Sequence, residues 1–260
     1  MTQSGSSTVL SERHGPIVVL TLNRPGKRNA VNDAVITDLQ RRLDELTDDV
    51  RAIIVRGGGD HFCAGLDLAE HVERAPFDVV ELSRRWHATL DRLQFGKRPV
   101  ISALQGAVIG GGLEIALASH VRVAEPSTFY QLPEGRRGIF VGGGGSMRVP
   151  RVIGAGRTVE MMLTGRKYNA TEGLQLGLSH YLVNIGDAFS HATLLAETIA
   201  GNSAISNYLI LNVLPRVAES PPEAGLMMEA LAAALAQTSD DAAEGLRAFL
   251  ERREPAFNKG

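Results

Sequence analysis

The sequence predicts an α/β protein with a largely parallel sheet, followed by a helical C-terminal region. Short β-rich runs alternate with amphipathic helical segments in the first part of the chain, which is typical of βαβ units. Strand signals stop at Asp187, and helical patterns continue from there. The chain has 260 residues, of which 44% are hydrophobic and 22% charged, so it can bury a sizeable core.

The first elements follow from local patterns. Ile17–Leu22 (IVVLTL) predicts a strand that ends at a turn containing Asn, Pro and Gly. Asn32 and Asp33 then open a helix, since apolar residues recur at a spacing close to 3.6 as far as Leu46. Ala52–Val55 predicts a second strand that ends at three glycines.

The middle of the chain repeats this alternation. Residues 78–95 predict a helix, and Val100–Leu104 predicts a strand that runs into Gly106. Three glycines followed by LEIALA predict a helix over Ile109–Ala118, and Val121–Ala124 again has strand character. Beyond Asp187 we expect helices over Ala188–Ala200, Ser203–Val217, Pro222–Gln237 and approximately Ala242–Arg252.

These patterns divide the chain into three regions. Residues 1–8 are small and polar and predict a flexible tail, residues 9–200 predict the α/β core, and residues 201–260 predict a helical region. Within the last region Leu226–Leu235 (LMMEALAAAL) is apolar around most of its circumference, so this helix must be buried. Either the core of the same chain or a subunit interface would bury it.

Composition excludes several classes of function. There are 27 Lys and Arg against 29 Asp and Glu, a formal charge of −2, which gives no electrostatic reason to bind nucleic acid. No apolar run reaches the 18 or so residues of a membrane span, and the first residues lack the features of a signal peptide. The single cysteine, Cys63, excludes an intrachain disulfide, and we expect a reducing compartment, most simply the cytoplasm.

Familiar cofactor motifs are missing. The sequence has no complete G-x-G-x-x-G, no P-loop, no nucleophile elbow and no H-E-x-x-H. We therefore expect no metal, no NAD and no other separate cofactor.

A glycine-rich helix start is the first candidate site. Gly110, Gly111 and Gly112 precede a helix, so backbone N–H groups there have no helical partner and no side chains to shield them. The helix dipole adds partial positive charge, which suits an anion or a developing oxyanion. Glu114 follows in the first turn and is either an ordinary complement of the dipole or a general acid or base.

Two further segments could join this site. Ala64 and Gly65 are small enough for a substrate to lie against the main chain and receive a second N–H donor, although Asp67 in a tight turn would also explain the pattern. Glu134 lies in a loop between a proline and a glycine, and it is either solvated or the second carboxylate of an acid–base pair with Glu114.

Taken together, these segments resemble the crotonase superfamily, the enoyl-CoA hydratase/isomerase family. The resemblance extends from Ile17 to Lys259 and is carried by several motifs. They are Arg24–Ala30 (RPGKRNA), Phe62–Leu68 (FCAGLDL), Gly110–Glu114 (GGGLE), Met162–Arg166 (MLTGR), residues 170–178 and the terminal helix with Phe257 and Lys259.

The resemblance implies a fold, an assembly and a substrate. The fold is a spiral of repeated ββα units with C-terminal helices that build homotrimers, often paired into hexamers. The substrate is a coenzyme A thioester, whose oxygen the N–H groups of Leu66 and Gly111 would bind. Other implied substrate contacts are Lys27, Arg28, Ala30, Ala64, Gly65, Asp67, Leu68, Gly110, Phe257 and Lys259.

The resemblance also implies a reaction. Family members that hydrate enoyl-CoA hold a water molecule between two glutamates, at the positions of Glu114 and Glu134 in this chain. Two nearby carboxyls in a dry pocket rarely both ionise, so we expect Glu134 as the protonated acid and Glu114 as the base. The alternatives are a Δ3,Δ2-enoyl-CoA isomerase or another crotonase reaction, and a non-catalytic acyl-CoA-binding member.

The chain departs from the family pattern after Glu134. Arg136 and Arg137 lie next to the acid, and Phe140-Val141 replaces an Ile-Pro pair. An arginine that contacts a carboxylate would lower its pKa and oppose the protonated state, so we expect both arginines to face solvent.

Overall fold

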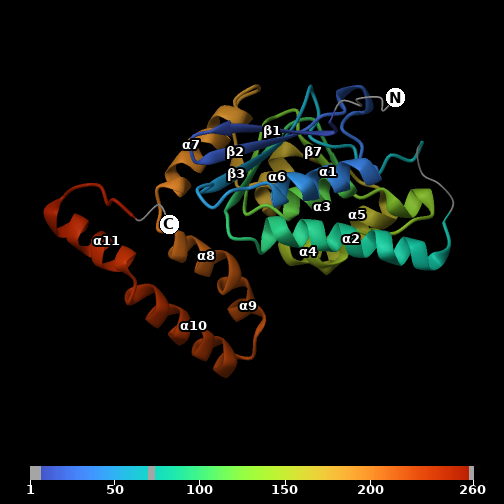
Figure 1. Ribbon diagram of the computed structural model, residues 1–260. Helices are drawn as coiled ribbons and strands as arrows, with labels where there is room; N and C mark the ends of the chain where they lie inside the picture. The colour runs from blue at the N-terminus through green and yellow to red at the C-terminus, as the bar shows by residue number, and fades with distance from the viewer. Residues whose placement is uncertain (1–6, 70–73, 258–260) are drawn as a thin grey trace.

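A six-stranded sheet forms the centre of the computed structural model, which describes residues 7–69 and 74–257 (Figure 1). The strand order is β1-β2-β3-β4-β6-β9, and every neighbouring pair is parallel except β1 with β2. Its strands are β1 (Val9–His14), β2 (Ile17–Leu22), β3 (Ala52–Gly57), β4 (Val100–Leu104), β6 (Val121–Ala124) and β9 (Tyr181–Leu182). The predicted α/β class with a largely parallel sheet is therefore confirmed.

A smaller sheet and the helices complete the fold. The second sheet has the order β5-β7-β8, with β5 (Ala107–Ile109), β7 (Phe129–Gln131) and β8 (Tyr168–Asn169). The helices are α1 (Asp33–Asp44), α2 (Pro76–Gln94), α3 (Gly111–Leu117), α4 (Gly145–Ile153), α5 (Ala155–Thr164), α6 (Ala170–Leu176), α7 (Ala188–Ala200), α8 (Ala204–Asn212), α9 (Leu214–Glu219), α10 (Pro222–Gln237) and α11 (Asp240–Glu251). Two short 3₁₀ helices are η1 (Pro25–Lys27) and η2 (Glu134–Arg137).

Both faces of the sheet are buried at the central strands β2, β3 and β4, which explains why these strands are almost continuously apolar. All six residues of β2 are buried or nearly so, and successive side chains point to opposite faces. Val18 and Leu20 join the main core beneath α1 and α2, whereas Ile17 and Val19 pack in a second cluster beneath α7. Ala192 is one of the small residues that let α7 approach the sheet closely.

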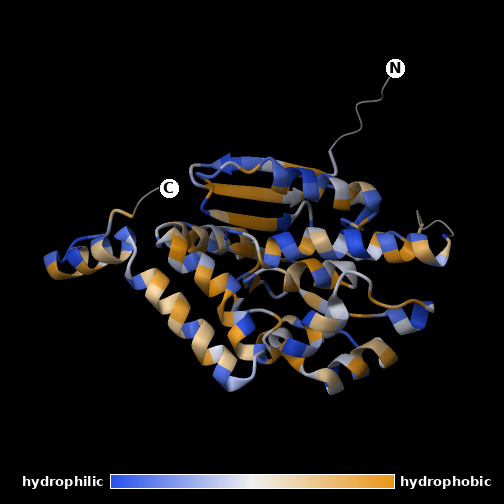
Figure 2. Cartoon of the chain, turned by 60° about the horizontal axis from the view of Figure 1, so that its bottom comes forward, coloured by the Kyte–Doolittle hydropathy of each residue, from blue (hydrophilic) through white to orange (hydrophobic). Residues whose placement is uncertain are grey.

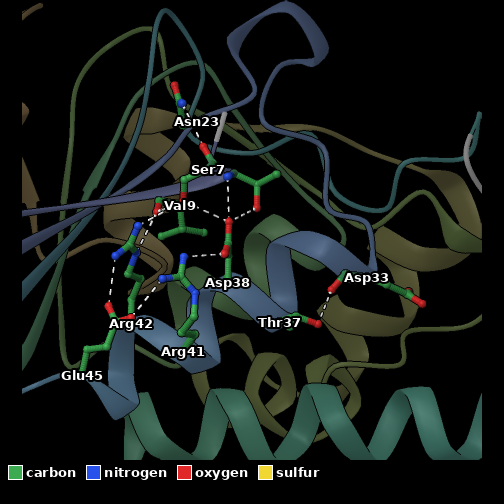
Figure 3. A network of polar contacts seen from close by, with 10 residues as sticks. Ser7, Val9, Asn23, Asp33, Thr37, Asp38, Arg41, Arg42 and Glu45 are labelled. Carbon is green, nitrogen blue, oxygen red and sulfur yellow. Dashed lines mark hydrogen bonds and ion pairs between the residues drawn. The ribbon is translucent and has the colours of Figure 1, made fainter. Parts of the chain in front are cut away.

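The N-terminal strand is held to α1 by a polar network around Asp38 (Figure 3). The Thr8 N–H and hydroxyl donate to Asp38 Oδ2 at 2.7 and 2.8 Å, and Ser7 Oγ donates to the same oxygen at 3.1 Å. Burial opposes ionisation of Asp38, but hydrogen bonds from Arg41, Thr8 and Ser7 outweigh it and hold its pKa well below the usual range. Ser7 and Thr8, assigned to the tail by composition, are thus anchored.

Element boundaries differ from the sequence prediction where local chemistry interrupts a pattern. The helix predicted from Ile109 begins at Gly111, because Ile109 pairs with Gln131 in the small sheet. The single helix predicted over 203–217 is two helices, α8 and α9, because Pro215 in the first turn of α9 has no N–H to continue the ladder.

The C-terminal arm, defined here as α10, α11 and the residues up to Phe257, extends away from the α/β body (Figure 1). Hydrophobic colour runs along α10 in Figure 2. Leu226, Met227, Leu231 and Leu235 are each at least 55% exposed. The core of the same chain therefore does not bury this helix, and that interpretation of Leu226–Leu235 is wrong.

None of the described helices combines the length and apolarity that crossing a membrane requires.

Candidate active site

The small sheet sets the start of α3. Ile109 lies in β5, and its N–H donates to the Cys63 carbonyl at 3.0 Å, while the Cys63 N–H donates to Ala107. Gly110 then turns the chain into the helix with φ of +50° and ψ of −120°, a conformation that L side chains rarely adopt. The strand pairing thus places segment 63–66 directly beside the glycine-rich helix start.

Leu66 presents a free N–H because of the geometry of a parallel bridge. Val31 donates to the Gly65 carbonyl at 2.7 Å and accepts from the Asp67 N–H at 2.8 Å. This pattern uses the groups on either side of Leu66, and the Leu66 N–H donates no hydrogen bond within residues 7–69 and 74–257.

The Gly111 N–H is the second free donor. It is the first residue of α3, so it has no helical acceptor, and it donates to no other described residue. Gly65 and Gly111 lie against each other, since a Cβ built on Gly65 would be 3.4 Å from the Gly111 nitrogen. Two unpaired N–H groups from adjacent backbone segments can bind one oxyanion.

Trp86 of α2 closes one side of this glycine cluster. Its ring would be 2.8 Å from a Cβ on Gly111 and also 2.8 Å from a Cβ on Gly143. Trp86 is 6% exposed, so it cannot swing aside freely. Neither glycine can therefore gain a side chain without displacing the ring.

Glu114 is buried on α3 and bound by two backbone donors. Its Oε1 accepts from the Gly143 N–H at 2.8 Å and from the Gly145 N–H at 2.7 Å. Burial raises the pKa of Glu114, while these two N–H groups and the charge of Arg148 oppose the rise. The ionised carboxylate thus has dedicated hydrogen-bond donors.

Glu134, the first residue of η2, lies against Gly110 at the start of α3. Its Oε1 would be 2.7 Å from a Cβ on Gly110, and the residue is 6% exposed. Its Oε2 has no hydrogen-bond partner among the described residues. Burial raises the pKa of Glu134 to about 7, and the nearby charge of Glu114 acts in the same direction.

The two carboxyls therefore lie in different environments. Glu114 accepts two N–H hydrogen bonds, which favour its ionised form, whereas Glu134 has a buried oxygen without a donor. Environments that separate the pKa values of two neighbouring carboxyls distinguish an acid from a base. Burial raises the pKa of both carboxyls, but the two N–H groups and Arg148 oppose the rise at Glu114, whereas the pKa of Glu134 reaches about 7.

The two arginines after Glu134 are exposed, as the sequence analysis expected. Arg137 contributes the smallest of the influences on the pKa of Glu134, and its effect does not overcome burial. Phe140 is also exposed, at 70%.

The loop Arg24–Ala30 is fastened to the segment after Cys63. Buried Asp67 pairs with Arg24 at 2.9 Å and with Lys27 at 3.8 Å, and the Ala64 N–H donates to the Arg28 carbonyl. The side chain of Asn29 accepts from the Arg24 N–H and donates to the carbonyls of Gly58 and His61. These ion pairs and hydrogen bonds hold the loop Arg24–Ala30 against residues 58–67.

The remaining predicted contacts are placed as follows. Ala30 and Gly65 are buried, and Leu68 is 43% exposed. Phe257 lies against Gly245 of α11, so it is on the C-terminal arm and not beside Glu114 and Glu134. Lys259 lies outside the described residues.

Sequence reasoning missed the residues that support Glu114. Trp86 and Arg148 are single residues in helices α2 and α4, with no motif to distinguish them from core or surface positions. The run Gly142–Gly145 stood out by composition, but only the fold shows that two of its N–H groups bind Glu114.

Cys63 is not a candidate nucleophile. It is fully buried, and burial raises the pKa of its thiol to about 12. No group of three or more His, Cys, Asp or Glu side chains suited to a metal ion occurs in the described part of the chain.

The fold and site define a protein of the crotonase class. The family model described as Enoyl-CoA hydratase/isomerase matches residues 12–260, and the chain belongs to this family.

Individual relatives agree along nearly the whole chain. A crystal structure from Rhodopseudomonas palustris, provisionally named an enoyl-CoA hydratase, superposes with a TM-score of 0.93 at 48% identity, covering 97% of this chain and 98% of that one. Enoyl-CoA hydratase EchA19 of Mycobacterium tuberculosis is 32% identical, with 95% of each chain covered. Enoyl-CoA hydratase domain-containing protein 2, mitochondrial, of Homo sapiens is 34% identical, with 97% of this chain and 90% of that protein covered.

Proposed function

We propose that this protein is an enoyl-CoA hydratase, which adds water across the 2,3 double bond of a trans-2-enoyl-CoA thioester. The observation that carries the proposal is a pair of buried carboxyls close enough to influence each other: Glu114 accepts hydrogen bonds from the Gly143–Gly145 loop, and Glu134 lies against Gly110 at the start of α3 with an oxygen that has no donor among the described residues. Family membership supports a crotonase-type enzyme acting on a CoA thioester.

The proposed reaction begins with polarisation of the thioester. The N–H groups of Leu66 and Gly111 bind the thioester oxygen, which makes C3 electrophilic and stabilises the enolate that forms. Ionised Glu114 accepts a proton from water as the water oxygen bonds to C3. Protonated Glu134 then donates its proton to C2, and the product is the 3-hydroxyacyl thioester.

The presence of two carboxyls favours hydration over double-bond isomerisation. Moving a double bond from position 3 to position 2 requires one group to carry a proton from C2 to C4, whereas hydration requires one base for water and one acid for C2. Glu114 and Glu134 supply both, and a non-catalytic binding protein would need neither.

We place the phosphates of coenzyme A near the loop 24–30. Lys27 is half exposed beside Asp67, and Arg28 is exposed, so both cations are accessible to an anionic ligand. The apolar face of the C-terminal arm is proposed to be covered by further copies of this chain, in a homotrimer or hexamer.

A cytoplasmic location also stays a prediction, which cell fractionation would check.

The test is a panel of CoA thioesters incubated with the purified protein. Loss of the absorbance of the conjugated thioester with trans-2-enoyl substrates, together with formation of 3-hydroxyacyl-CoA by mass spectrometry, is the expected result. The panel includes cis- and trans-3-enoyl-CoA. If absorbance rises with these substrates and no hydrated product forms from the 2-enoyl set, the protein is an isomerase and the hydratase proposal is wrong.

A further inference from the structure

A buried arginine connects the loop that binds Glu114 to helix α2. Arg148 of α4 is 3% exposed, and its Nη1 donates to the Gly143 carbonyl at 2.8 Å. Its Nε donates to Gln94 Oε1 at 2.6 Å, and its Nη2 pairs with Asp91 at 2.8 Å. The guanidinium thus spans α2 and the Gly143–Gly145 loop.

The loop cannot be held in this way without its glycines. A Cβ on Gly144 would lie 2.2 Å from Arg148 Nη1, and Gly144 has φ of +96°. The backbone at Gly144 therefore lies directly against the guanidinium, in a space that a side chain would fill. In this position of the loop, the N–H groups of Gly143 and Gly145 donate to Glu114 Oε1.

We propose that Arg148 is a positioning residue for Glu114: it fixes the Gly143–Gly145 loop whose N–H groups bind this carboxylate, and it supplies a buried positive charge close to it. Arg148 does not touch the thioester in this arrangement. The inference deepens the proposed function, because it rests on Glu114 acting as the ionised base.

The charge of Arg148 and the loop that it holds both favour the ionised form of Glu114. Two charged or titratable side chains act on the ionisation of Glu114, Arg148 from α4 and His87 from α2. Two acidic residues are coupled to this pair: Glu134 from η2, whose pKa the charge of Glu114 raises, and Asp91 from α2, which pairs with Arg148. Arg148 favours the ionised form and His87 does so less strongly. Loss of the arginine therefore raises the pKa of Glu114, both by removing charge and by loosening the two N–H donors.

The test compares three variants with the wild-type protein. Arg148→Gln removes the positive charge and the guanidinium N–H donors. Arg148→Lys keeps the charge but cannot donate in the several fixed directions of a guanidinium. Arg151→Gln is the matched control, since Arg151 is on the same helix, half exposed and paired with Glu219 at 2.7 Å, and it is not among the charges that act on Glu114. Each variant is first checked for folding by circular dichroism and thermal melting.

Two measurements are made on each protein. The Glu114 carboxyl is titrated by ¹³C NMR on protein labelled at the glutamate carboxyl carbon, with the resonance assigned by its loss in Glu114→Gln. The kcat and KM for hydration of trans-2-butenoyl-CoA are measured across pH. The NMR titration needs no turnover, so it decides the inference even if the wild-type protein proves not to hydrate this substrate.

We expect Arg148→Gln to raise the pKa of Glu114 and to lower kcat about ten-fold to a hundred-fold, part of the 10²–10⁴ contributed by a positioned proton-transfer group. KM stays near the wild-type value, and Arg148→Lys recovers part of both effects. Arg151→Gln changes neither the pKa of Glu114 nor kcat.

A folded Arg148→Gln protein whose Glu114 titrates at the wild-type pH overturns the inference. If Arg148→Gln does not fold, the same comparison is made with Arg148→Lys. Absence of hydration by the wild-type protein would instead refute the proposed function.

Discussion

At the scale of single residues, the site depends on how two chemically identical side chains come to differ. The Glu114 carboxyl accepts two backbone N–H hydrogen bonds, whereas Glu134 has a buried oxygen without a donor among the described residues. The difference follows from the loop geometry around each carboxyl and not from the residue type.

The first prediction concerns replacement of each carboxyl by its amide. Glu134→Gln keeps the shape of the side chain but has no proton to give to C2, so kcat falls by about 10²–10⁴-fold. Glu114→Gln removes the proposed base, so kcat of this variant falls by a similar factor. Steady-state hydration rates check this, with binding of a saturated acyl-CoA as the control. Wild-type rates in either variant would contradict the two-glutamate mechanism.

The second prediction is a pH dependence. Since burial raises the pKa of Glu134 to about 7, the acid is protonated below that pH and loses its proton above it. The value of kcat/KM for hydration is thus expected to fall as the pH rises through about 7. A pH–rate profile measures this limb. If the rate stays constant from pH 6 to pH 9, Glu134 is not the acid that limits turnover.

The third prediction tests the oxyanion donors. Gly111→Val forces a side chain into the ring of Trp86 and moves the N–H away from the thioester oxygen. Losing one such donor costs about 2.7–4 kcal/mol of transition-state stabilisation, so turnover falls by more than a hundred-fold. The absorption band of a bound enoyl thioester, which shifts to the red when the carbonyl is polarised, should lose that shift. A folded variant with the full shift and full rate would remove Gly111 from the site.

At the scale of elements, the fold brings distant segments together through short pairings. The Val31–Leu66 and Cys63–Val108 bridges hold two loop segments beside strand β5, which leads into α3. The network around Asp38 similarly joins the N-terminal strand to α1 (Figure 3).

The fourth prediction concerns this Asp38 network. The pKa of Asp38 in the folded protein lies below its unfolded value, so its stabilisation is present above about pH 4 and is lost as the pH falls further. Asp38→Asn is expected to lower the free energy of unfolding by about 1–3 kcal/mol at pH 7. Urea denaturation of both proteins at pH 7 and pH 3 measures this. If the difference in free energy of unfolding between the two proteins is as large at pH 3 as at pH 7, the charge of Asp38 does not contribute to stability.

At the scale of the whole molecule, the exposed C-terminal arm is the feature that a single chain leaves unexplained. Leu226, Leu231 and Leu235 of α10 and Phe249 and Leu250 of α11 are all more than half exposed. A patch of this kind on a folded protein marks an interaction surface.

The fifth prediction is therefore an oligomer of this chain. Light scattering at micromolar concentration should give a mass of three or six chains. Leu231→Glu puts a charge in the proposed interface and should shift the mass towards one chain, while Glu229→Gln on the same helix should leave it unchanged. A wild-type monomer would contradict the proposal.

The pattern of apolar residues along the chain is sufficient to predict the class of fold, because alternating apolar runs predict buried parallel strands without any tertiary information. The resemblance of the motifs around Glu114, Glu134 and the glycines of α3 to the crotonase family also predicts the family, which the match over residues 12–260 confirms, while the roles of these residues stay predictions. The helices α4, α5 and α6 and strands such as β7 and β9 were not assigned, because they are short and their pattern is weak.

Only the tertiary structure decided how the carboxyls differ and what supports them. Nothing near Glu114 in the chain indicates that Gly143 and Gly145 bind it, since 29 and 31 residues separate these donors from the acceptor. Nor does the sequence distinguish an apolar helix in the core from one on an exposed arm, because the pattern of apolar residues along the chain is the same in both cases. Ionisation and burial depend on the three-dimensional surroundings of a group, whereas strand and helix patterns depend on its neighbours in the chain.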